Sequence, residues 1–205
     1  MSRLFDAYIF VDWSAKTGPT RVKPSRDAIW VGELTRGGDG AETYCRTRAA
    51  ATAYVKELLL SHVRAERRVL VGFDFPYGYP AGLAAHLAND DSPAWRKVWS
   101  FLGSAIQDDE SNKSNRFAVA SQINALIGDG PGPFWGCPPS QISDAGLTPR
   151  MKGLFTYPFA TPTGLLGRLR RTEQAMSGVQ ETWKLLGAGS VGSQALLGIP
   201  RVLAL

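Results

Sequence analysis

The chain has 205 residues, of which 44% are hydrophobic and 20% are charged, a balance that fits one globular domain and excludes a disordered protein. No run approaches the roughly 18 consecutive apolar residues of a membrane span, and the N-terminus lacks the basic and then apolar layout of a signal peptide, so we expect a cytoplasmic protein with no membrane partner. Two cysteines without CxxC spacing and two histidines argue against a structural zinc site and against a disulfide.

The positive charge is concentrated near the end of the chain. Residues 1–145 hold 16 basic and 16 acidic side chains, whereas the last sixty residues hold seven basic and two acidic ones and so account for the net charge of +5. Such an excess suits a polyanionic partner, namely a nucleic acid or a nucleotide. A solvated basic helix face is an equally good explanation, and the sequence gives no indication of an oligomeric state.

The first third of the chain predicts a strand, a hairpin and a helix. Residues 7–12, AYIFVD, form an apolar run that ends in Asp12 and predict a buried strand. Two further runs, 27–35 and 42–46, flank the turn sequence RGGDG and predict a β-hairpin. Residues 47–64 place their apolar side chains on one stripe at helical spacing, which predicts an amphipathic helix.

The stretch RVLVGFDFPYGYP, residues 68–80, predicts a second strand that ends in an acid. Its apolar run is too short for a helix, and the two prolines forbid continuation of a sheet ladder, so Asp74 lies at a strand's carboxyl end. Ligands of open α/β sheets bind beyond those ends. If the two strands are neighbours, Asp12 and Asp74 face each other, and such a pair either shares a proton or holds a divalent cation. Taken singly, each acid is explained by capping of backbone amides. For the pair we predict a Mg²⁺ or Mn²⁺ site.

The rest of the chain predicts a helical insertion in a single domain that spans residues 1–205. The insertion runs from about residue 77 to about residue 178. The elements expected within and after it are helices over 80–87, 92–106, 116–127 and 162–176 and a strand over 180–186. The proline- and glycine-rich stretch 128–141 is expected to be an irregular loop.

A glycine-rich turn follows the last of these elements. Gly187, Gly189 and Gly192 fit the pattern GxGxxG, but the chain ends too soon to supply the second strand and the acid that a dinucleotide fold requires. The turn can still present backbone N–H groups to a phosphate at the start of a short helix, so Ser190 and the three glycines are candidate phosphate-binding residues. A tight connection between a strand and a helix is the alternative.

The segment from Asp12 to Lys16, DWSAK, is similar to the first phosphate loop of actin-like ATPases, in which an acid, a hydroxyl and a cation meet a nucleotide and magnesium. Ser14 is therefore a further candidate for phosphate binding. Trp13 stands where those loops have glycine, and no second aspartate-glycine phosphate motif follows. A nucleotide-binding phosphotransferase of the actin-like kind and a non-catalytic binding module are thus two alternatives to a nuclease.

Four stretches, FVDWSAK, VGFDFPYGYP, SNRFAVASQIN and GAGSVGSQALLGIP, together resemble a bacterial family that is predicted to contain RNase H-like nucleases, the domain-of-unknown-function family 429. Some relatives in that family carry labels for cobalamin or molybdenum cofactor biosynthesis. The resemblance implies an α/β fold with an RNase H-like mixed sheet and a divalent-metal-dependent phosphodiesterase acting on nucleic acid.

The same resemblance implies roles for particular residues. Asp12 would bridge two metal ions and Asp74 would hold one of them, while Lys16 or Arg116 would neutralise charge on the phosphoryl group. A complete site needs a third acid. The candidates within the chain are Glu57, Glu173 and Glu181. Glu57 lies on the predicted helix one turn beyond Ala53, and a solvent-facing side chain is the alternative for it. The chain ends at an apolar tail, which favours a truncated domain whose missing acid lies past Leu205.

Overall fold

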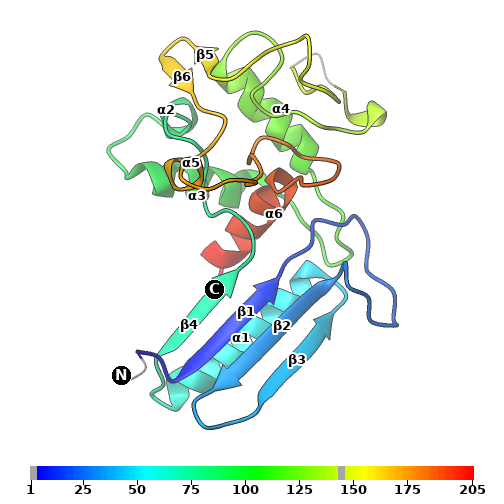
Figure 1. Ribbon diagram of the computed structural model, residues 1–205, viewed down its shortest axis with the longest axis vertical. Coiled ribbons are helices and arrows are strands. Elements are labelled where there is room, and N and C mark those ends of the chain that lie inside the picture. The colour runs from blue at the N-terminus through cyan, green and yellow to red at the C-terminus, as the bar shows by residue number, and fades with distance from the viewer. Residues whose placement is uncertain (1–3, 143–145) are drawn as a thin grey trace. The chain divides into compact units, whose positions relative to one another are not determined.

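The computed structural model describes residues 4–142 and 146–205 and divides the chain into two compact units (Figure 1). The sheet unit contains the chain up to Phe75, the returning segment Asp108–Ser114, and Leu205. The helical unit contains Pro76–Gln107 and Asn115–Ala204. The predicted α/β class with a mixed sheet is confirmed.

The sheet unit is built on four strands in the order β3-β2-β1-β4 (Figure 1). Their bounds are β1 Ala7–Asp12, β2 Ile29–Thr35, β3 Gly40–Cys45 and β4 Val69–Phe73. β2 runs antiparallel to β1 and to β3, and its pairing with β3 forms the predicted hairpin, whereas β4 runs parallel to β1. A parallel pair needs a crossover connection, and α1 (Arg48–Arg64) supplies it.

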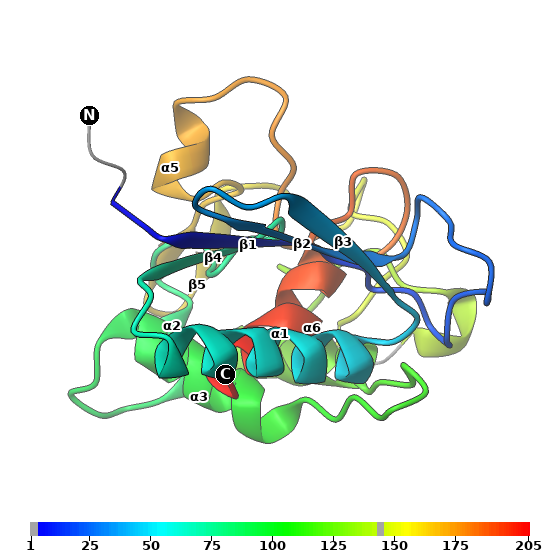
Figure 2. The ribbon, with the colours of Figure 1, turned by 90° about the horizontal axis from the view of Figure 1, so that it is seen from below.

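One face of this sheet is covered by α1, and the other carries Asp12. Figure 2 shows α1 lying along one face, and the side chains of Ala7, Ile9 and Val11 that point to it are at most 2% exposed. Thr47 caps the helix by accepting a hydrogen bond from the Ala50 N–H. Because successive side chains of a strand alternate between faces, Asp12 points to the opposite, open face.

The helical unit consists of five α-helices, one 3₁₀ turn and a small hairpin within the described residues. They are α2 Ala84–Leu87, α3 Ala94–Ala105, α4 Arg116–Ile127, η1 Pro139–Gln141, β5 Phe159–Thr161, β6 Gly164–Leu166, α5 Arg171–Gln174 and α6 Gly192–Leu203. Helix α3 packs against α2 and α6, and α4 packs against the same two helices. No helix among the described residues is both long enough and apolar enough to cross a bilayer.

Two predicted elements of the helical unit are wrong. The expected helix over 162–176 is instead the turn and second strand of the β5–β6 hairpin, followed by the short α5, because Pro162 lies in the turn and Gly164, with φ of 143°, begins β6 directly after it. The expected strand over 180–186 forms only an isolated bridge between Lys184 and Trp135. The helix predicted over 80–87 is shorter than expected, since Gly82 has φ of 104°.

A buried amide holds the glycine- and proline-rich loop of the helical unit in place. Asn124 is fully buried on α4, and its side-chain nitrogen donates to the carbonyl oxygens of Phe134 and Gly146 at 2.9 and 3.2 Å. Its side-chain oxygen accepts the Phe134 N–H at 2.9 Å. The Phe134 ring packs edge-on against Trp183 with ring centroids 5.0 Å apart. This loop is therefore fixed to the core of its own unit.

Candidate functional site

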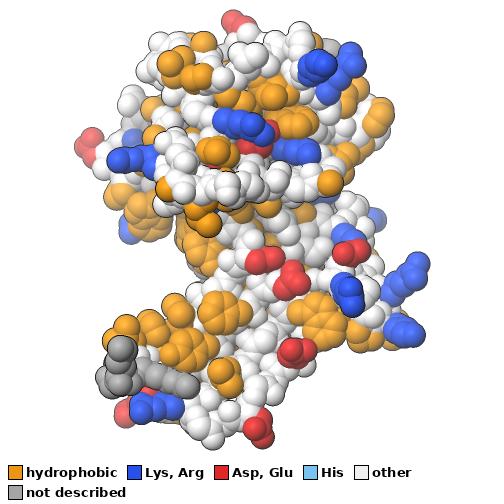
Figure 3. Space-filling model, in the orientation of Figure 1, with side chains coloured by type: hydrophobic (Ala, Val, Ile, Leu, Met, Phe, Trp, Pro, Cys, Tyr) orange, Lys and Arg blue, Asp and Glu red, His pale blue; other side chains and the backbone are white. Residues whose placement is uncertain are grey.

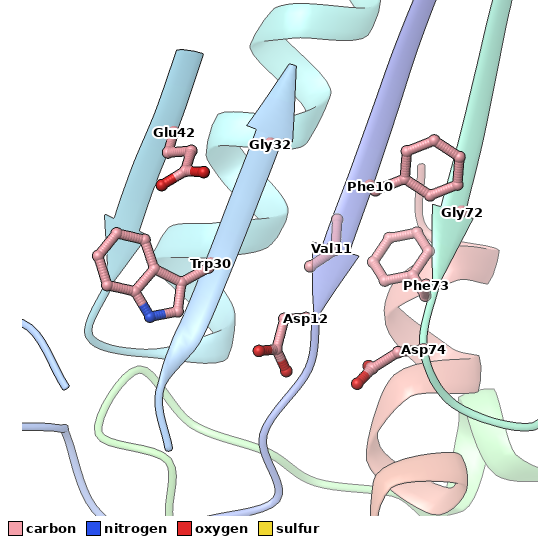
Figure 4. Close-up of a pocket in the computed structure, with 9 residues that line it drawn as sticks. All are labelled: Phe10, Val11, Asp12, Trp30, Gly32, Glu42, Gly72, Phe73 and Asp74. Atoms are coloured by element: carbon pink, nitrogen blue, oxygen red, sulfur yellow. The ribbon is translucent and has the colours of Figure 1, made fainter. Parts of the chain in front are cut away.

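Asp12 and Asp74 lie side by side on the open face, at the carboxyl ends of two adjacent parallel strands (Figure 4). The register pairs Val11 with Phe73, so the next residue on each strand is one of the two acids. The Asp74 N–H donates to the Val11 carbonyl at 3.2 Å and extends the ladder by one bond. The two strands are thus neighbours, as predicted, and the acids at their ends lie next to each other.

The two carboxylates influence each other electrostatically. The pKa of Asp12 is raised above its ordinary value, first by partial burial and then by the negative charge of Asp74 and a side-chain hydrogen bond with it. The charge of Asp27 adds to this effect. Asp74 accepts the Trp13 N–H through Oδ1 at 2.7 Å, which holds its carboxylate in one orientation. A cation placed beside Asp12 would offset the negative charge that Asp74 adds there.

Aromatic packing under the sheet fixes the loops that carry the acids. Trp13 is 2% exposed and meets Phe73 and Phe75 with ring centroids 5.8 Å away in each case. Phe73 and Phe75 also contact each other. The residue after Asp12 and the residues on both sides of Asp74 are therefore parts of one buried cluster. A tryptophan in this position, which departs from the phosphate loops of actin-like ATPases, has a packing role here.

Arg48, the first residue of α1, anchors the loop that follows Asp12. Its guanidinium is fully buried and donates to both carboxylate oxygens of Asp108, with Nε–Oδ2 at 2.8 Å and Nη2–Oδ1 at 2.6 Å. Its Nη1 donates to the carbonyl oxygens of Ser14 and Lys16 at 3.1 and 2.9 Å. Asn112 completes the arrangement by accepting the Arg48 N–H and donating to the Gly18 carbonyl. The sequence did not single out these residues, because their pairing joins segments far apart in the chain.

A cavity of about 410 Å³ opens on the sheet face next to the acids and is lined by the nine residues drawn in Figure 4. Besides Asp12 and Asp74, it holds the side chains of Phe10, Trp30 and Glu42, which the sequence analysis did not propose. Because side chains alternate along β1, Phe10 lies on the same face as Asp12. The positions of Trp30 and Glu42 in the cavity depend instead on how β2 pairs with β1 and β3. That register pairs Trp30 with Asp12 and Glu42 with Gly32.

A basic loop leads away from Asp12 and includes two of the predicted site residues. The exposed cations of this loop are Lys16, Arg21, Lys23 and Arg26. Figure 3 shows Lys and Arg side chains gathered over the loop, with acidic side chains nearby. Lys16 Nζ lies 3.5 Å from Asp27 Oδ2, and Ser14 Oγ accepts the Lys16 N–H at 3.3 Å. A second hollow of about 400 Å³ lies within the loop and is lined mainly by polar residues, among them Lys16, Arg21 and Ser25.

The structure does not bring Glu57 to the aspartate pair. Ala51 and Val55 are the buried residues near it on α1, and they face the sheet. Glu57 is exposed, two residues beyond Val55, so it points away from the sheet on the helix that covers the opposite face from Asp12. The other two candidate acids belong to the helical unit and are buried in contacts there. Glu173 pairs with Arg170 at 2.7 Å, and Glu181 accepts from Trp135 at 2.8 Å and pairs with Arg168.

The remaining predicted residues also belong to the helical unit. Arg116 is 6% exposed, and its Nε donates to Ser193 Oγ at 3.0 Å. Gly187 and Gly189 have φ of 97° and 70°, and the Ser190 N–H closes a turn on the Gly187 carbonyl. The Gly192 N–H donates to the Lys184 carbonyl at 3.0 Å, so it is not directed at a ligand. These contacts give the turn before α6 a structural role.

Comparisons with protein-family models, with curated proteins and with solved structures found no match for this chain. The geometry of the site is therefore the basis for assigning a function.

Proposed function

We propose that the sheet unit is a divalent-metal-dependent phosphodiesterase of the RNase H-like class that acts on nucleic acid. The observation that carries the proposal is the pair of exposed carboxylates of Asp12 and Asp74 at adjacent strand ends. The order β3-β2-β1-β4, with a helix before the parallel fourth strand, supports it. It puts acids on the first and fourth strands, where the family resemblance implies metal-binding carboxylates.

The donor set suits magnesium or manganese. Among the described residues, no group of three or more His, Cys, Asp and Glu side chains is close enough to hold a metal together. Two protein carboxylates are nevertheless enough for Mg²⁺, which keeps several waters and is usually held by one or two carboxylates together with substrate phosphate oxygens. Asp74 is already oriented by the Trp13 N–H, which leaves its second carboxylate oxygen to face Asp12. When bound, the metal supplies activation of water and stabilisation of the leaving oxygen.

The side chains around the pair would position the phosphodiester. The Arg48 guanidinium donates to the Lys16 carbonyl and so fixes the Lys16 backbone, while the Lys16 ammonium forms an exposed ion pair with Asp27. Such a pair contributes about 0–1 kcal/mol, so the ammonium can move to a phosphate oxygen at little cost. The cations of the loop beyond it would follow the backbone of a bound strand.

The first experiment is calorimetric titration of Mn²⁺ into the wild-type chain, Asp12→Asn, Asp74→Asn and the control Glu57→Gln. We expect saturable binding that each aspartate variant loses and that Glu57→Gln retains, because Glu57 lies on the other side of the sheet. Absence of binding to the folded wild type would overturn the metal site. Retention of binding in both aspartate variants would show that the metal lies elsewhere.

The second experiment is cleavage of labelled single-stranded, duplex and branched DNA and RNA in Mn²⁺, with EDTA as the control. We expect products that disappear in EDTA and in Asp12→Asn. Metal binding without cleavage of any substrate would favour a non-catalytic binding module over a nuclease.

A further inference from the structure

The cavity beside the acids has an aromatic side chain on each of two opposite sides (Figure 4). Phe10 is 55% exposed, and its ring lies over Gly72, where an added Cβ would come within 2.7 Å of two ring atoms. The Trp30 indole donates through Nε1 to the Ser25 carbonyl at 3.0 Å and packs on Tyr44 with ring centroids 5.3 Å apart, which holds that ring in place.

Between these two rings the floor is open because Gly32 has no side chain. Gly32 pairs with Phe10 on one side and with Glu42 on the other, so the three residues form one row across β1, β2 and β3. The cavity volume of about 410 Å³ falls within the range of roughly 300–1,000 Å³ that is common for small-molecule sites. The space admits a planar ring system lying against an aromatic side chain.

Glu42 supplies the polar recognition group. Its carboxylate is exposed, lines the cavity next to the Trp30 indole, and makes no hydrogen bond or ion pair within residues 4–142 and 146–205. An ionised carboxylate offers two acceptor oxygens and no donor. Its best planar partner therefore presents two adjacent N–H donors.

We propose that this cavity binds a guanine base, stacked on Phe10 or Trp30 and held through its N1–H and 2-amino group by Glu42. Adenine and cytosine place a ring-nitrogen acceptor beside their amino group, and uracil places its single N–H between two carbonyl acceptors. In each case at least one acceptor would face the carboxylate oxygens and repel them. The proposal rests on the proposed function in that the base would belong to the strand whose phosphate reaches Asp12 and Asp74. The guanine preference itself comes from the cavity.

The test is equilibrium binding in EDTA, so that it does not depend on the metal. Calorimetry would compare guanosine, inosine and adenosine monophosphates and a short guanine-containing oligonucleotide. Guanosine monophosphate should bind saturably at millimolar or lower concentration, and inosine monophosphate, which lacks the 2-amino group, should bind several-fold more weakly. Binding of the oligonucleotide alone would assign the site to guanine within a strand. Binding of neither guanine probe to the folded protein would overturn the proposal.

Variants then test the two recognition elements. Glu42→Gln should weaken guanine binding by roughly tenfold and remove the discrimination against inosine, because a charge-assisted pair of hydrogen bonds is lost. Phe10→Ala should weaken it by roughly 5- to 100-fold through lost stacking. Asp39→Asn, in the turn of the same hairpin and outside the cavity, is the matched control and should bind as the wild type does. Unchanged affinity in Glu42→Gln, or equal binding of adenosine and guanosine monophosphates, would overturn guanine recognition.

Separate titrations of the wild type with Mn²⁺ and, in EDTA, with guanosine monophosphate distinguish this inference from the proposed function. If the wild type binds guanine but not Mn²⁺, the guanine site stands and the nuclease proposal fails. If the wild type binds Mn²⁺ but no guanine, the metal site stands and the guanine proposal fails.

Discussion

Replacement of Arg48 by Met should destabilise the sheet unit by about 3–5 kcal/mol, because it leaves Asp108 as a buried charge without its partner cation. The two side chains are 0% and 4% exposed, so water cannot replace the lost guanidinium. Three carbonyl oxygens, those of Ser14, Lys16 and Asn112, lose a donor at the same time. Met fills much of the space of the Arg stem and adapts its shape, which keeps the cavity contribution small.

Urea unfolding followed by circular dichroism measures this loss. The double variant Arg48→Met with Asp108→Leu removes both charges and should regain a large part of the stability, since a buried ion pair can often be replaced by apolar side chains at little net cost. A loss below about 1 kcal/mol in the single variant would refute the argument from the isolated charge. A double variant no more stable than the single one would refute it equally.

Asp12→Asn should raise the melting temperature of the metal-free protein at neutral pH by about 1–2 °C, because it removes an unfavourable energy on the order of 0.5 kcal/mol, which comes first from partial burial of the Asp12 charge and then from its solvent-screened repulsion by Asp74. Since the pKa of Asp12 is raised in the folded state, this penalty is fully present above that folded pKa and disappears below the ordinary value of 3.8, where the two melting curves should meet. Equal melting curves at neutral pH would contradict the prediction. Asn124→Ala should cost about 2–4 kcal/mol in urea unfolding, since it removes three buried hydrogen bonds, and a cost under 1 kcal/mol would be inconsistent with their role. Gly192→Ala should cost more than about 2 kcal/mol, because its Cβ would lie 2.4 Å from the Thr182 carbonyl oxygen, whereas the control Gly78→Ala enters open space and should change the unfolding midpoint little.

The sheet unit could be predicted because its signals are local. A run of apolar residues that ends in an acid, a glycine-rich turn and a proline that stops a ladder each act within a few residues. The position of Asp74 relative to Asp12 then needed only one further assumption, that the two strands are neighbours, and the register of β1 with β4 satisfies it.

Other parts of the site depend on contacts between segments that lie far apart in the chain, and no local sequence pattern reveals such contacts. Trp30 and Glu42 reach the cavity only through the pairing of β2 with its two neighbours. Glu57 was a candidate from its place on the predicted helix, but the helical period turns it away from the sheet, which is the solvent-facing alternative. Arg116 illustrates the same limit, because its burial against Ser193 joins residues 77 positions apart.

The helix predicted over 162–176 failed for a local reason. The composition of this segment favours a helix, but Pro162 in the turn and Gly164 directly after it favour a turn between two short strands, and the chain forms that turn. Thr161 strengthens that turn by donating from Oγ1 to the Gly164 carbonyl at 2.9 Å.

The return of Asp108–Ser114 to the sheet unit makes that unit discontinuous in sequence. A fragment cut after Phe75 would keep Arg48 and lose Asp108, and it would also lose the Asn112 contacts to the helix start and to Gly18. Such a fragment should aggregate or stay unfolded even though it contains every strand of the sheet. A shortened protein that is meant to keep the acids would need residues 108–114 joined back by a linker. The same connection makes proteolytic nicking between α3 and α4 a threat to the site itself, although the cut would lie more than thirty residues from either aspartate in sequence.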